Sequence, residues 1–128
     1  METAIQKLAI VFFFVTGISH IVQPRAWVRF FIMIREKGES GSLINAFIHI
    51  PVGALIIAFH NVWHGIPIIL TLIGYGLVLK SFIYFVFPGR ALKSLGRVSM
   101  ERSWEVVVAG VISVGISGLL LFTLVAKR

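Results

Sequence analysis

Four long runs of apolar residues, separated by three more polar segments, set the pattern of this chain. Each run approaches the roughly 20 residues that an α-helix needs to cross the hydrocarbon core of a bilayer. Backbone polar groups surrounded by lipid must find their partners within the segment, so each run is expected to be a helix. The predicted spans are residues 4–23, 43–60, 67–87 and 106–126. The pattern therefore predicts an all-α, integral membrane four-helix bundle that forms a single domain over residues 1–128.

The composition agrees with a membrane protein and excludes several other classes. Of the 128 residues, 58% are hydrophobic and only 13% are charged, whereas a soluble domain has about 25% charged residues. The chain has no cysteine, which excludes disulfides and thiolate chemistry. The formal net charge is +7, and most of the basic residues lie in the segments between apolar spans. We therefore expect the lipid bilayer, and no nucleic acid, as the partner of the basic residues.

The distribution of basic residues predicts the orientation in the membrane. Residues 61–66, between the second and third spans, contain no Lys or Arg, whereas the first and third connecting segments hold Arg25, Arg29, Arg35, Lys37, Arg90, Lys93, Arg97 and Arg102. By the positive-inside rule, the first and third segments are cytoplasmic and both termini lie outside. Lys127 and Arg128 oppose this orientation but are outnumbered. We expect a multi-pass protein of the cell membrane.

The first connecting segment has a helical pattern of its own. Pro24 opens it, and Arg25, Arg29 and Glu36 share one helical face, with apolar residues such as Val28 on the rest. This pattern predicts a short amphipathic helix that lies in the membrane interface after the first span. The alternative is a solvated basic loop that only sets the topology.

The two halves of the chain are also similar to each other. His20 and Pro24 near the end of the first span are paralleled by Tyr84 and Pro88 near the end of the third. A basic amphiphilic segment and another apolar span follow in each half. Two hairpins of the same orientation would be related by an axis along the membrane normal. Chance similarity is the alternative.

Ionisable side chains within membrane spans cost about 2.5–3.5 kcal/mol on insertion scales, so each is a candidate functional residue. The ionisable residues that lie in or beside the spans, in their cytoplasmic halves, are His20, His49, Lys80 and Glu105. Asn45 lies one turn before His49, and Tyr84 lies one turn after Lys80, so each pair shares a helical face. If these faces turn inward, the bundle holds a polar ligand or proton site formed by His20, Asn45, His49, Lys80, Tyr84 and Glu105.

Three of these residues also have purely structural interpretations. Lys80 could extend along its aliphatic stem to the headgroups. Glu105 could pair with Arg102 at the interface, and His20 could cap the end of its helix. A bis-histidine haem site formed by His20 and His49 is a further alternative, because they lie at similar depth on neighbouring antiparallel spans. The sequence does not otherwise identify a cofactor.

His49 is too deep in its span to reach the headgroups. We therefore predict that it makes a polar contact inside the bundle. Pro51, two residues later, removes a backbone donor and leaves the carbonyl of Phe47 without its helical partner. That carbonyl is a candidate acceptor for His49, for Asn45 or for a water molecule.

His60 and His64 are the candidate metal ligands on the outer side, because the i,i+4 spacing of helical zinc pairs would place both rings on one helical face. A zinc site needs three or four ligands, and no third ligand lies nearby in the sequence. We therefore expect the pair to lie at an interfacial hairpin tip, with a metal site as the alternative.

The fourth span carries small residues on one face. Ala109, Ser113 and Ser117 form a stripe, with Gly110 and Gly118 beside it. Such faces allow close approach of helix backbones in lipid. We expect this face to serve either the bundle itself or a partner.

The end of the first span resembles a motif of DoxX-like membrane proteins, Gly-x-x-His-x-x-x-Pro, which this chain matches at Gly17, His20 and Pro24. Those proteins are four-span chains of similar length, and their second span reads Glu-(Leu/Ile)-x-x-Gly. Here the corresponding stretch runs from His49 to Gly53, so a histidine replaces the intramembrane glutamate. The resemblance covers roughly residues 8–87. It implies a redox-associated or quinone-associated membrane protein, often an accessory subunit, and the replacement puts in doubt any role that needs a carboxylate at this position.

These observations favour a small accessory membrane subunit, redox-associated or quinone-associated, with a polar ligand or proton site in the inner half of the bundle. The alternative is a proton-coupled transporter or channel for a small solute, acting as an oligomer because four spans enclose little volume. The sequence contains no nucleophile or carboxylate pair that would support a membrane-embedded enzyme. We expect either a membrane protein partner or a homo-oligomer.

Overall fold

The computed structural model describes residues 1–126, and every secondary-structure element in this range is a helix. Lys127 and Arg128, which entered the topology argument, lie outside the described residues. The elements are α1 (Glu2–Val22), α2 (Pro24–Glu36), α3 (Glu39–Phe59), α4 (Ile68–Val86), α5 (Pro88–Ser94), the 3-10 turns η1 (Leu95–Arg97) and η2 (Met100–Arg102), and α6 (Ser103–Ala126).

Within the described residues, four helices are long and apolar enough to cross a membrane. They are α1, α3, α4 and the continuous stretch from η2 through α6, and each predicted span falls on one of them. Large apolar side chains such as Phe14 and Phe122 stand exposed on their outer faces, a surface suited to lipid rather than water. The predicted all-α, four-helix membrane bundle is confirmed, and the chain is a multi-pass membrane protein.

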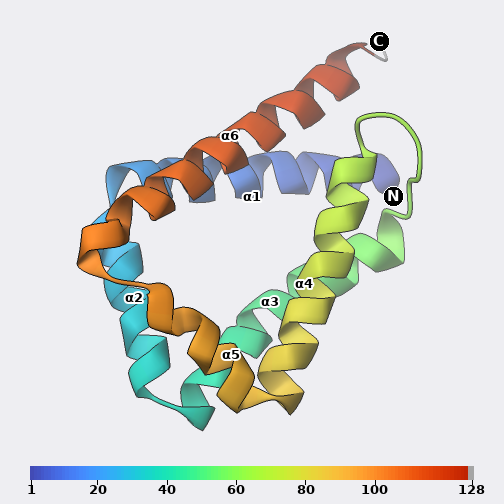
Figure 1. Ribbon diagram of the computed structural model, residues 1–128. Coiled ribbons are helices and arrows are strands. Elements are labelled where there is room, and N and C mark those ends of the chain that lie inside the picture. Colours follow the sequence, from blue (N-terminus) through green and yellow to red (C-terminus); the bar gives the residue numbers. More distant parts are fainter. Residues whose placement is uncertain (127–128) are drawn as a thin grey trace.

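The four long helices pack as two pairs, α1 with α6 and α3 with α4 (Figure 1). In the first pair the backbones approach closely at Gly17 and Gly110. A Cβ atom added at Gly17 would lie 2.8 Å from the carbonyl oxygen of Gly110. Ser117 Oγ donates a hydrogen bond to the carbonyl of Ile10 in the same pair (2.9 Å). Small residues therefore set the distance between α1 and α6, as expected where lipid gives no hydrophobic drive for association.

The packing face of α6 contains only part of the predicted set of small residues. Ala109 and Gly118 are exposed, and Ser113 is only half-buried. The buried residues of α6 are Val106, Gly110, Ser117 and Leu120. The predicted set was therefore right for Gly110 and Ser117, which contact α1, and wrong for Ala109 and Gly118.

Helices α1 and α4 end in the same way. Their C-caps, Gln23 (φ −128°, ψ 54°) and Phe87 (φ −125°, ψ 64°), have nearly the same backbone conformation. Pro24 and Pro88 then begin α2 and α5, as suits a residue that lacks an amide hydrogen and is preorganised for the first helical position. Because α1 packs on α6 as α4 packs on α3, the two halves follow the same course, in agreement with the predicted internal similarity.

The segment after the first span forms the predicted amphipathic helix, α2. Arg25 and Arg29 are exposed, and Val28 and Ile34 are buried. Arg35 Nη1 donates hydrogen bonds to two carbonyls of the connection between α5 and α6, so that α2 is tied to this connection. The alternative of a solvated loop is therefore wrong. The position of α2 in the membrane interface remains a prediction.

Candidate functional site

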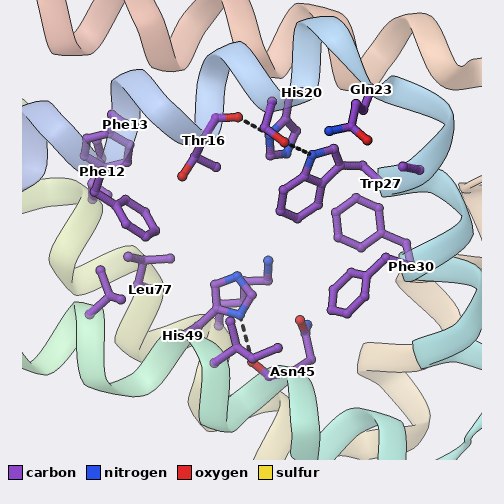
Figure 2. Close-up of a pocket in the computed structure, with 17 residues that line it drawn as sticks. Phe12, Phe13, Thr16, His20, Gln23, Trp27, Phe30, Asn45, His49 and Leu77 are labelled. Carbon is purple, nitrogen blue, oxygen red and sulfur yellow. Dashed lines mark hydrogen bonds between the residues drawn. The ribbon is translucent and has the colours of Figure 1, made fainter.

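A cavity of about 650 Å³ lies between α1 and the α3–α4 pair, with α2 along one side (Figure 2). This volume is within the range of ligand-binding pockets, about 300–1,000 Å³. Aromatic rings from α1 and α2 form much of its wall: Phe12, Phe13, Trp27, Phe30 and Phe31. Its polar lining residues are Thr16, Ser19, His20, Gln23, Asn45, His49 and Lys80.

His20 reaches the cavity from the last turn of α1. Its Nδ1 lies 2.7 Å from the carbonyl oxygen of Thr16, one turn earlier, and donates to it. Its ring stacks on Trp27, which is anchored by a hydrogen bond from Nε1 to Ser19 Oγ (3.0 Å). The helix break before Pro24 produces this arrangement, because it turns α2 back so that Trp27 covers His20.

His49 projects from α3 toward the middle of the cavity (Figure 2). Its Nδ1 donates to the carbonyl oxygen of Asn45, 2.7 Å away. The predicted polar contact of His49 inside the bundle is therefore present, and it is made with the backbone. The acceptor is the carbonyl of Asn45 rather than that of Phe47, which Pro51 was expected to expose.

The two histidines are thus held in the same way. A neutral imidazole that donates from Nδ1 carries its free lone pair on Nε2. Within residues 1–126, neither Nε2 has a hydrogen-bond partner from the protein, so the cavity contains two acceptor nitrogens. These are also the atoms that would ligate iron in the haem alternative.

Lys80 and Asn45 complete the polar part of the cavity. Lys80 Nζ lies 5.9 Å from the ring centroid of Tyr84, at the limit of a cation–π contact. The ion pair of Arg97 with Glu105 is the only salt bridge among the described residues, so Lys80 has no carboxylate partner there. Asn45 is 3% exposed. An ammonium and an amide therefore supply donors to the cavity beside the two imidazole acceptors.

Tyr84 and Glu105 do not join the other four predicted site residues. Tyr84 is buried with Ala46 and Ala91, away from the cavity lining. Glu105, in the first turn of α6, accepts a hydrogen bond from Arg97 (Nη2 to Oε1, 2.7 Å). The expected pairing of Glu105 with Arg102 was wrong, because η1 places Arg97 beside it. The structure thus brings together His20, Asn45, His49 and Lys80.

His60 and His64 are not on one helical face. Helix α3 ends at Phe59, so that both lie in the connection to α4. His60 is fully buried, whereas His64 is exposed. Among the residues described, no group of three or more His, Cys, Asp or Glu side chains could hold a metal ion. The zinc alternative assumed that both histidines lie on one helix, and this was wrong because α3 ends before them.

His60 instead belongs to a buried polar network that the sequence analysis missed. Gln6 Nε2 donates to His60 Nε2 (2.9 Å), and His60 Nδ1 donates to Thr71 Oγ1 (3.1 Å). Thr71 Oγ1 donates in turn to the carbonyl of Val62 (2.8 Å). This network joins α1, the second connection and α4. The signal in the sequence was an uncharged polar residue, Gln6, inside an apolar span.

Comparisons with protein-family models, with curated proteins and with solved structures find no match to this chain. The resemblance to DoxX-like proteins therefore remains an expectation based on its motif residues.

Proposed function

We propose that the protein is a quinone-associated subunit of a membrane redox assembly and that it holds a quinone headgroup in the central cavity. One observation carries this proposal. His20 and His49, fixed by the same type of backbone hydrogen bond, present two free imidazole nitrogens to one aromatic-walled cavity.

The chemistry of a quinone fits this lining in both of its redox states. A quinol has two hydroxyl groups that donate hydrogen bonds, and the Nε2 atoms of His20 and His49 accept them. An oxidised quinone has two carbonyl oxygens, to which Lys80 and Asn45 have donors to offer. The flat ring also finds aromatic partners in Trp27 and its neighbours on α2.

The histidines also suit a proton site. Imidazole is the side chain whose ordinary pKa lies nearest neutral pH, so it can take a proton from a bound hydroxyl and release it again. A carboxylate is not needed for that step, which removes the difficulty raised by the replacement of glutamate by His49.

The motif that carries the family resemblance has a physical role at each of its positions. Gly17 allows α1 to approach α6, His20 lines the cavity, and Pro24 begins the helix that carries Trp27. The resemblance supports a redox association and a larger assembly, with a membrane protein partner. We place the two basic connections on the cytoplasmic side.

A titration of the purified protein tests the proposal. In a variant with Trp63→Phe and Trp104→Phe, Trp27 is the remaining tryptophan, and it lines the cavity. We expect saturable quenching of its fluorescence by a short-tailed benzoquinone and by the corresponding quinol. The additional change His49→Leu should remove saturation, whereas His64→Gln, outside the cavity, should not. Quenching that is linear in quinone and equal in all variants would contradict the proposal, and stoichiometric binding of haemin in its place would favour the haem alternative.

A second candidate, a proton-coupled transporter acting as an oligomer, is favoured by a different observation. The cavity lies between two separately packed helix pairs, and movement of one pair against the other would open it to either side. Reconstituted vesicles with a pH-sensitive dye inside would report proton movement. Solute-dependent acidification that is lost in His49→Leu would favour transport over the subunit role.

A further inference from the structure

A second, smaller hollow adjoins the central cavity. It has a volume of about 120 Å³ and lies between α1 and α3. Its lining is wholly apolar and consists of Ile5, Leu8, Ala9, Phe12, Phe13, Val52, Leu55 and Ile56. We call it the α1–α3 pocket.

The α1–α3 pocket and the central cavity share three lining residues, Phe12, Phe13 and Val52. Figure 2 shows Phe12 and Phe13 at one end of the cavity, with His20, Trp27 and Phe30 toward the other and His49 between. The polar groups therefore lie on one side of this aromatic pair and the apolar pocket on the other. The two hollows are therefore adjacent and share a wall, one with polar lining residues and the other with apolar lining alone.

We propose that these two adjacent hollows together form a single site for an amphiphile with a planar head and one apolar tail, whose first segment lies in the α1–α3 pocket. This rests on the proposed function, which supplies the quinone head. It narrows the natural ligand to a membrane-resident quinone that carries a tail.

The pocket has a size that fits the beginning of such a tail. A volume of about 120 Å³ is slightly below the roughly 150 Å³ of an apolar protein cavity that binds one benzene molecule. It therefore takes a short branched segment, of the size of one isoprene unit. A water molecule would find no polar side chain there to bond, which disfavours water as the occupant.

The rest of the tail has a way out into the bilayer. Leu8 and Leu55, on opposite sides of the pocket, are 56% and 43% exposed. Both belong to helices that are apolar enough to cross a membrane, so their exposed surface meets lipid. A tail of any length can leave the pocket between them.

Photolabelling in lipid nanodiscs tests the inference. The probe is a benzoquinone with a long alkyl tail and a diazirine on the tail next to the ring. We expect peptides covering residues 5–13 or 52–56 to be labelled, and an excess of unlabelled tailed quinone to compete. Labelling confined to other helices, or labelling of these peptides by a diazirine phospholipid that the quinone does not displace, would overturn the inference.

Two matched variants separate the tail site from the head site. Leu55→Trp fills the α1–α3 pocket and should lower labelling about fivefold through steric exclusion of the tail. Leu121→Trp, on the exposed surface of α6, is the control and should leave labelling unchanged. The tailless benzoquinone should bind Leu55→Trp as it binds the unmodified protein. If the tailless benzoquinone binds both proteins equally and photolabelling of Leu55→Trp is also unchanged, the tail inference fails while the proposed function stands. If neither the tailed nor the tailless quinone binds the unmodified protein, the tail inference and the proposed function both fail.

Discussion

The imidazole of His20 lies face to face with the indole of Trp27, with ring centroids 4.2 Å apart and planes inclined by 17°. The two residues come from different helices, α1 and α2, that meet at the break before Pro24. The stack therefore connects the basic amphipathic helix directly to a residue of the cavity. The orientation of α2 therefore affects how any ligand contacts His20.

Trp27 is therefore expected to matter for ligand binding. Trp27→Leu removes both the stack and the hydrogen bond to Ser19, and the aromatic contribution of about 0.5–1.5 kcal/mol corresponds to a loss of affinity of up to about tenfold. Trp27→Phe keeps an aromatic face and should lose less. Equilibrium dialysis with a short-tailed benzoquinone measures both. Trp104→Leu, an exposed position on α6, serves as the control, and an equal loss there would contradict a specific role.

His49→Leu should affect binding much more than folding, because leucine suits a membrane interior. The paired change His20→Leu should couple to it if both nitrogens hold one ligand, with an interaction energy of at least about 0.5 kcal/mol. A double-mutant cycle of quinone affinities, read beside the thermal unfolding temperature of each variant, measures both quantities. Strictly additive losses of affinity would show that the two histidines do not share a ligand.

The positions of the spans could be predicted from the sequence because the bilayer itself decides them. The length of an apolar run is a local property of the sequence. In lipid, such a run must form a helix, because a helix satisfies all backbone hydrogen bonds within one segment. The same holds for α2, whose alternation of Arg25 and Arg29 with Val28 shows its two faces without any knowledge of its neighbours. The depth of His20, His49 and Lys80 follows from their distance to the ends of these runs.

The faces on which the helices meet could not be predicted with the same success. Tyr84 shares a helical stripe with Lys80, yet it is buried against Ala91 of α5, a helix that the sequence analysis did not anticipate. Glu105 pairs with Arg97, because the short turns before α6 decide which basic residue lies beside it. The sequence analysis did not anticipate these turns either. Phe12 and Phe13 were overlooked as cavity residues because an apolar side chain in a membrane span gives no contrast between lipid and an interior wall. Trp27 was overlooked because it reaches the cavity only through the turn between α1 and α2 that brings it over His20.

The contact between Gly17 and Gly110 should be a main determinant of stability. A Cβ atom at Gly17 would meet the backbone of α6 at 2.8 Å, and backbone cannot move aside as a flexible side chain can. Gly17→Ala should therefore lower stability by about 1–3 kcal/mol, the usual cost of overpacking.

Gly118→Ala provides the matched control for Gly17→Ala. It lies on α6 with nothing within 4 Å of an added Cβ, and it should be neutral or slightly stabilising because alanine favours the helix. Unfolding of the two variants in mixed detergent micelles makes the comparison. Equal stabilities would mean that the close approach of α1 to α6 contributes little to the fold.

The orientation in the membrane is open to a direct test, because the chain has no cysteine of its own. Ser40, at the start of α3, and Asn61, in the connection to α4, are both exposed and lie at opposite ends of α3. Single cysteines at these positions should react with a membrane-impermeant maleimide from opposite sides, Ser40→Cys only after the cytoplasmic face is opened. The physical reason is the charge asymmetry: eight basic residues lie in the first and third connections and none in residues 61–66, and translocating that charge is disfavoured. Labelling of Asn61→Cys only from the cytoplasm would reverse the orientation. The basic helix α2, and with it the histidine end of the cavity, would then face outward.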